Sequence, residues 1–170
     1  MPKKSAKTSD SKKFKLSIDL VPMPSWGKSL SKILTGGQWK KIRTEVPERN
    51  GNKCEICSSL ENIQCHEHWK FDDETQTQTL AGLGTICRMC HFAMHMGRAG
   101  QIVDIEVVKS HFMKINQCDR AALEKHAGEA GEIFLKRSSH QWRIDYGEYA
   151  GIVAQTLEAR EKRKKKKEGK

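Results

Sequence analysis

Alternating apolar and polar positions predict extended segments in three parts of this chain. Residues 15–21 and 140–146 place apolar side chains at every second position, which is typical of strands. Residues 61–71 also have an extended pattern, and they are followed by a polar loop. We expect residues 140–146 to pair with residues 15–21 in one small sheet.

Helical spacing of apolar residues accounts for much of the remaining chain. Residues 29–49 predict two helical pieces separated by a Thr-Gly-Gly sequence, and Pro47 is expected to end or kink the second piece. Further helices are predicted to start at Cys87, to cover 105–115 and 119–134, and to run from about Tyr149 toward the C-terminus. Together these segments predict an α+β fold in which helices surround a small sheet.

Charge divides the chain into one neutral domain with two basic ends. The 170 residues carry a net charge of +10, yet residues 16–159 hold 17 basic and 18 acidic side chains. We therefore predict a single domain over 15–158 between a disordered basic tail, 1–14, and a Lys-rich tail, 159–170.

The C-terminal tail is the more strongly charged end, and cations of this kind bind phosphates without reading sequence. This favours a nucleic-acid partner, although a merely solvated tail has the same composition. In a eukaryotic host the run would also be typical of a nuclear address. The cationic residues are Arg160, Lys162, Arg163, Lys164, Lys165, Lys166 and Lys167.

The sequence predicts neither membrane insertion nor secretion. No apolar run approaches the roughly 20 residues that a membrane span requires, and the N-terminus lacks the apolar core of a signal peptide. We expect a cytoplasmic, reducing compartment, in which closely spaced cysteines are metal ligands rather than disulfide partners.

Two Cys-x-x-C pairs supply the ligands for one tetrahedral zinc ion. Cys54 and Cys57 follow a turn, while Cys87 and Cys90 open a helix, and this combination is how a treble-clef zinc finger is built. Four thiolates leave no open coordination position, so the predicted zinc site is structural. Four ordinary buried cysteines are the alternative.

Histidines predict a second site near the first. His91 and His95 lie one helical turn apart and share a face. On the extended segment, His66 and His68 share one face, and either could be a third ligand or a base. Three protein ligands with one open position are typical of a catalytic metal site. Ordinary surface histidines would explain the same pattern without a metal.

Several motifs resemble the zinc-knuckle branch of the HNH endonucleases. They are WKKIRTEVPERNGNKCEIC, CHEHW and GTICRMCH, which together cover about residues 39–97. A wider pattern over about 18–147, including CRMCHFAMHMG and RSSHQWRID, looks like a bacterial and phage HNH-like branch. The resemblance implies a ββα-metal core over 39–97, stabilised by structural zinc, with a helical extension over 102–158.

The resemblance also implies roles for individual residues. His66 is implied as the general base. His68 is the alternative, and Glu67 before it resembles the acid of the acid–His pair found in many HNH strands, so Glu67 is implied as a catalytic residue as well. His91 and His95 are implied as ligands of a second divalent metal, which would be Mg²⁺, Mn²⁺, Ni²⁺ or Zn²⁺. Such a site would hydrolyse phosphodiester bonds, and the family favours double-stranded DNA over RNA as the partner.

One position departs from the family pattern. HNH proteins have an Asn about five residues before the second Cys pair, and Gly82 stands there in this chain. Gln78 has a comparable amide at a different spacing. The departure keeps two alternatives open, a non-catalytic zinc-stabilised module that binds nucleic acid, and a small phage or bacterial protein-interaction factor. Nothing in the sequence specifies the oligomeric state.

Overall fold

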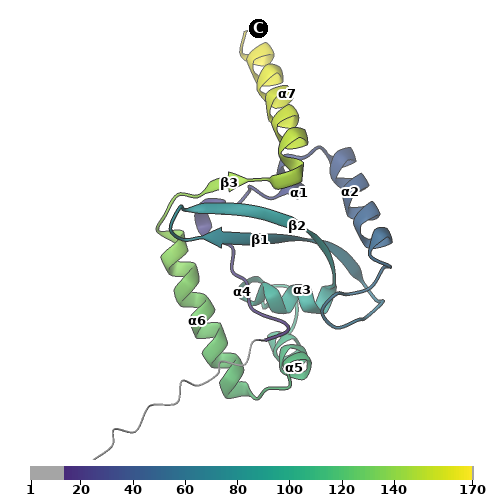
Figure 1. Cartoon of the computed structure of the whole chain (residues 1–170), viewed down its shortest axis with the longest axis vertical. Coiled ribbons are helices and arrows are strands. Elements are labelled where there is room, and N and C mark those ends of the chain that lie inside the picture. Colours follow the sequence, from purple (N-terminus) through teal and green to yellow (C-terminus); the bar gives the residue numbers. More distant parts are fainter. Residues whose placement is uncertain (1–13, 170) are drawn as a thin grey trace, which may run out of the picture.

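The computed structural model describes residues 14–169, in which short helices surround one small sheet (Figure 1). The elements are, in chain order, the 3₁₀ turn Met23–Ser25, α1 (Leu30–Ile33), α2 (Gly36–Arg49), β1 (Ile63–Asp72), β2 (Thr77–Cys87), α3 (Arg88–Met94), α4 (Met96–Ala99), α5 (Ile105–Asn116), α6 (Arg120–Ser138), β3 (Arg143–Asp145), the 3₁₀ turn Gly147–Tyr149 and α7 (Ala150–Glu168). The predicted α+β class is confirmed.

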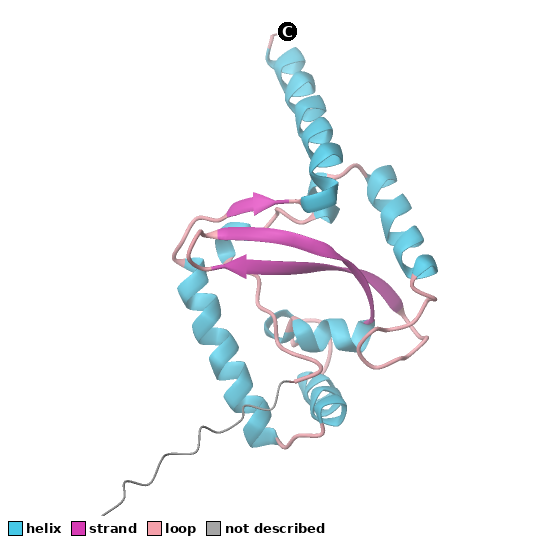
Figure 2. Cartoon of the chain, in the orientation of Figure 1, coloured by secondary structure: helices cyan, strands magenta, loops and turns pink. Residues whose placement is uncertain are grey.

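A long β-hairpin forms the centre of the molecule (Figure 2). β1 and β2 pair antiparallel, and β3 adds to the other edge of β2 as a short parallel strand. The register shifts between His68 and Trp69, because these residues pair with Gly82 and Leu80 and leave one extra residue on β2. α3 follows β2 without a loop, so hairpin and helix form one continuous unit.

Helices cover the two faces of this hairpin. The larger core lies beneath α3, α5 and α6, and its fully buried side chains include Leu16, Ile86, Val108, Phe112 and Leu123. On the opposite face, a smaller core forms between α1, α2, β2 and α7, with Leu30, Ile33, Leu34, Leu80 and Val153 buried. Each face of the hairpin is therefore buried against a different set of helices.

The predicted strand at 15–21 is wrong, and so is its pairing with the segment at 140–146. Residues 15–21 form an extended strap whose backbone is bound by helix side chains instead of by a neighbouring strand. The Leu16 amide donates to Asn116 Oδ1 (3.0 Å), and Asn116 Nδ2 donates to the Leu16 carbonyl (2.7 Å). The Ile18 amide donates to His126 Nε2 (3.0 Å). The alternation of apolar and polar residues over 15–21 therefore predicted correctly which side chains are buried. It could not predict which groups hydrogen-bond to the backbone of this segment.

Pro47 was expected to end or kink the second helical piece, and the helix does end close to it. α2 contains Pro47 and ends two residues later, at Arg49, with Asn50 as its C-cap. A proline so close to the end interrupts little of the helical hydrogen bonding, and its ring is buried.

The basic C-terminal segment belongs to the last helix, which was predicted to run from about Tyr149 toward the C-terminus and begins at Ala150. α7 continues to Glu168 and projects from the body of the molecule (Figure 1). Arg160 fixes the base of this projection, because its guanidinium donates to the carbonyls of Lys32 and Leu34. The cationic side chains beyond it are exposed along the helix. The disorder predicted for 1–14 falls on residues outside those described, apart from Phe14, whose ring packs on Phe112.

Within residues 14–169, every helix is too short or too polar to cross a bilayer.

Candidate metal centres

The four predicted zinc ligands come together at the start of α3. Cys54 and Cys57 lie in the turn before β1, Cys87 is the N-cap of α3, and Cys90 lies in its first turn. Their sulfur atoms all lie within 4.8 Å of one another, and Cys57 Sγ is 3.5 Å from Cys87 Sγ. Two sulfurs of one tetrahedral zinc, at about 2.3 Å from the ion, lie roughly 3.8 Å apart. The cluster could therefore hold a metal ion such as zinc.

The surroundings of the sulfurs also suit a cation. Burial opposes ionisation of Cys54, but hydrogen bonds from backbone amides, including those of Cys57 and Cys87, lower its pKa to about 7. Burial and then the neighbouring Cys54 raise the pKa of Cys90 far above its usual range. Several thiolates this close together need a positive charge between them, and a structural zinc ion would supply it.

Three histidines form a second cluster on the same face of the hairpin. His66 comes from β1, His91 from α3, and His95 is the residue that caps α3. Their ring nitrogens all lie within 4.8 Å of one another. His66 Nε2 is 3.4 Å from His95 Nε2, and two nitrogens bound to one tetrahedral zinc lie about 3.3 Å apart. This cluster could also hold a metal ion.

Outer hydrogen bonds orient two of these rings. His95 Nδ1 is 2.9 Å from the carbonyl oxygen of Asp19, which only accepts, so Nδ1 carries the proton and Nε2 presents a lone pair to the cluster. His91 Nδ1 lies 2.7 Å from Gln64 Oε1 and is oriented in the same way. Hydrogen bonds of this kind fix the tautomer of metal-binding histidines.

His66 is the third ring of the cluster that could hold a metal ion. Its ring is buried, and its Nδ1 has no hydrogen-bond partner among the described residues. Burial, followed by the nearby His95 and His91, lowers the pKa of His66 to about 2, and burial with His95 lowers that of His91 to about 4. Both rings are therefore neutral near pH 7, which is the form that binds metals.

His68 occupies a different position, at the edge of the cluster. Its ring is 5.3 Å from that of His66, and its side chain is 40% exposed. His68 Nε2 lies 2.8 Å from Glu55 Oε1, a residue of the knuckle between Cys54 and Cys57. A ring that donates from Nε2 to a carboxylate keeps Nδ1 free to accept a proton. The geometry therefore pairs His68 with Glu55 and leaves Nδ1 of the His68 ring as the nitrogen that could accept a proton.

Gly84 makes this pair possible. It lies on β2 opposite His66, and a Cβ atom there would overlap His68 Nε2 and the Glu55 carboxylate. We expect Gly84→Ala to separate His68 from Glu55 while the fold persists, because only the ends of two flexible side chains must move. Any activity that depends on the pair should fall by about 10²-fold or more. Gly128→Ala is the matched control, since a Cβ there meets nothing within 4 Å. Equal activity of the two variants would show that the contact has no role.

Glu67 does not belong to this site, so its proposed contribution to the base is corrected. On a strand, successive side chains point to opposite faces, and Glu67 faces away from His66 and His68. Its carboxylate accepts from Trp69 Nε1 (3.1 Å) and from the backbone amides of Leu30 and Ser31. Burial raises its pKa, while those amides oppose the rise. Glu67 thus binds the first turn of α1, for which Ser29 provides no side-chain cap.

We expect Glu67→Ala to lower the free energy of unfolding by about 1–3 kcal/mol, because the Leu30 and Ser31 amides and the Trp69 indole lose their acceptor. Urea denaturation measures this change. Metal binding by the histidine cluster should be unaffected. If Glu67→Ala had normal stability but no longer bound a metal at the histidine cluster, Glu67 would be a functional residue of the site after all.

Neither residue considered for the missing Asn position substitutes for it. Gly82 pairs directly with His68, at φ +151°, beside the register shift. Gln78 pairs with Phe71, five residues along β1 from His66, or about 17 Å away. Gln78 is buried there, and its distance excludes a contact with the histidines.

Sequence reasoning missed three residues of the site, namely Glu55, Gln64 and Asp19. Gln64 shares the strand face of His66, so alternation could have found it. Glu55 lies inside the first Cys pair, but nothing in the sequence shows how far its side chain reaches. Asp19 contributes a backbone carbonyl from a distant strap, and no residue-type signal could have indicated it.

No family model matches the chain, and comparisons with curated proteins and with solved structures found no match.

Proposed function

We propose that this chain is a metal-dependent endonuclease of the HNH type that hydrolyses phosphodiester bonds in DNA. The observation that carries the proposal is the convergence of His66, His91 and His95 beside the His68–Glu55 pair, on one hairpin followed directly by a helix. A structural zinc finger needs only the four cysteines, so the second cluster calls for a separate role. The motif resemblance supplies the reaction class.

The roles of the residues follow from their positions. His66, His91 and His95 would hold a divalent metal, which when bound stabilises charge on the scissile phosphate and on the leaving oxygen. His68 Nδ1 accepts a proton from water while Glu55 holds the ring through Nε2. The water oxygen forms a bond to phosphorus, and the bond from phosphorus to the ester oxygen breaks. That oxygen leaves and takes a proton from solvent.

Substrate attraction is assigned to α7. Its exposed cations, from Lys162 to Lys167, lie along a projecting helix that contacts the body of the molecule near Arg160. Each phosphate contact releases counterions, so DNA binding should weaken steeply as salt is raised. Such contacts hold a duplex without reading its sequence.

Plasmid cleavage by the purified, zinc-loaded protein tests the proposal. We expect nicking or linearisation that requires added Mg²⁺, Mn²⁺, Ni²⁺ or Zn²⁺, and that is lost in a His66→Ala, His91→Ala double variant. Retained cleavage in the double variant would assign the activity to another site or to a contaminant.

A second candidate function is a non-catalytic module that binds nucleic acid, and Gly82 at the usual Asn position favours it. Its signature would be the absence of cleavage with any metal, together with salt-sensitive DNA binding that is lost when residues 160–170 are deleted. The absence of both cleavage and binding would leave the protein-interaction factor.

A further inference from the structure

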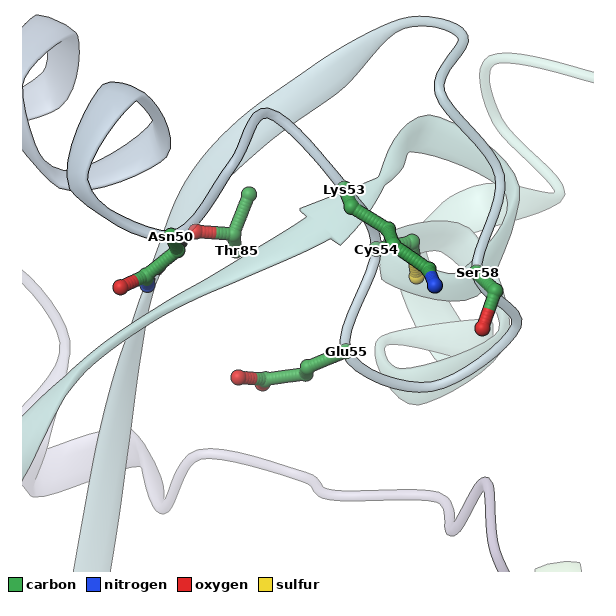
Figure 3. Close-up of a pocket in the computed structure, with 6 residues that line it drawn as sticks. All are labelled: Asn50, Lys53, Cys54, Glu55, Ser58 and Thr85. Carbon is green, nitrogen blue, oxygen red and sulfur yellow. Dashed lines mark hydrogen bonds between the residues drawn. The ribbon is translucent and has the colours of Figure 1, made fainter.

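A polar hollow lies beside the His68–Glu55 pair, on the knuckle that carries the first Cys pair. Its volume is ≈ 430 Å³, and it is lined by Asn50, Lys53, Cys54, Glu55, Ser58 and Thr85 (Figure 3). Small-molecule sites commonly measure about 300–1,000 Å³. The hollow is therefore larger than one phosphate needs and is large enough to receive a nucleoside as well.

The wall of the hollow is hydrogen-bonded to the sheet. The Glu55 amide donates to the Thr85 carbonyl (2.9 Å), and Asn50 Nδ2 donates to Thr85 Oγ1 (2.9 Å). Thr85 is fully buried. These contacts hold the end of α2 and the knuckle against the edge of β2.

The exposed groups of the hollow suit a phosphate next to a polar ring. Lys53 is exposed, and its ammonium has no ion-pair partner among residues 14–169. Figure 3 shows Lys53 and Ser58 toward one side of the hollow and Asn50 and Glu55 toward the other. An ammonium beside a hydroxyl binds phosphate oxygens, whereas an amide and a carboxylate bind ring donors and acceptors.

Glu55 connects the hollow to the proposed reaction site. It lines the hollow, and it also holds His68 Nε2 at 2.8 Å. A strand whose scissile phosphate lies at the histidine cluster would therefore have an adjacent nucleotide at the hollow.

We propose that this hollow is a nucleotide subsite, in which Lys53 and Ser58 bind the phosphate next to the scissile one and Asn50 faces the nucleoside. The assignment rests on the proposed function for the identity of the strand, but binding in the hollow needs no cleavage. Lys53 is here a binding residue and takes no part in proton transfer.

Thymidine 3′,5′-bisphosphate is the probe, because it presents two phosphates and one nucleoside and has no internucleotide bond to cut. We expect its titration into zinc-loaded, ¹⁵N-labelled protein to shift the amide signals of Lys53, Glu55 and Ser58. Lys53→Ala should weaken this binding about tenfold. Lys125→Ala, on the exposed surface of α6, is the matched control and should bind as the wild type does.

The salt dependence of DNA binding gives a second measurement. Lys53→Ala should reduce the slope of log K against log salt by about 0.9, the value for one phosphate contact. Unshifted amides over 53–58, or equal binding by the Lys53 and Lys125 variants, would overturn the subsite. Binding of the probe in the hollow without plasmid cleavage would contradict the nuclease proposal and leave the subsite standing. Plasmid cleavage without binding of the probe in the hollow would contradict the subsite and leave the nuclease proposal standing.

Discussion

Cys90→Ser is expected to remove the structural metal and with it the cooperative folding of the domain. Cys90 is completely buried at the point where the knuckle, β2 and α3 meet. Zinc bound by such clusters contributes apparent free energies of about 10–16 kcal/mol, more than the whole stability of many domains. We expect one equivalent of zinc fewer per chain by metal analysis, and no cooperative transition by circular dichroism on heating.

Cys65→Ser is the matched control for this prediction. Cys65 lies on β1, outside both clusters, and burial raises the pKa of its thiol to about 11, so it is not a competing thiolate at pH 7. The control should keep its zinc and its thermal transition. Unchanged zinc content in Cys90→Ser would contradict the assignment of the four cysteines as one site.

His68→Ala is expected to lower kcat for plasmid cleavage by roughly 10²–10⁴-fold, the range for loss of a general base. Because His68 lies outside the cluster formed by His66, His91 and His95, the variant should still bind the second metal. Single-turnover cleavage, combined with calorimetric titration of metal, separates the two effects. His66→Ala should show the opposite result: its affinity for the second metal should fall, and cleavage should be lost as a consequence.

His140→Ala provides the comparison for both variants. His140 is exposed and contacts Gln76 at the far end of the hairpin, so its loss should change neither measurement. If His68→Ala cleaved as His140→Ala does, His66 would again be the leading base, as the family resemblance implied.

The different fates of Glu67 and Glu55 show where sequence reasoning reached its limit. Glu67 is adjacent to both strand histidines in sequence, yet strand geometry sends its carboxylate to the opposite face, where it binds α1. Glu55 is eleven or more residues from either histidine, yet the knuckle folds back against the edge of β2 and brings it to His68. The space above Gly84, which His68 and Glu55 fill, is equally a property of the pairing between β1 and β2.

The sequence by itself determined the local features of this protein. The Cys-x-x-C spacing, the separation of His91 and His95 by one helical turn, and the shared face of His66 and His68 each depend on a fixed local geometry, so they could be predicted. Only the tertiary structure decided which histidine completes the cluster and which pairs with a carboxylate. It also made residues 15–21 a strap that orients His95 through the Asp19 carbonyl. These outcomes depend on contacts between segments far apart in the chain, and local periodicity does not encode which distant backbone or side chain will fill a given hydrogen bond.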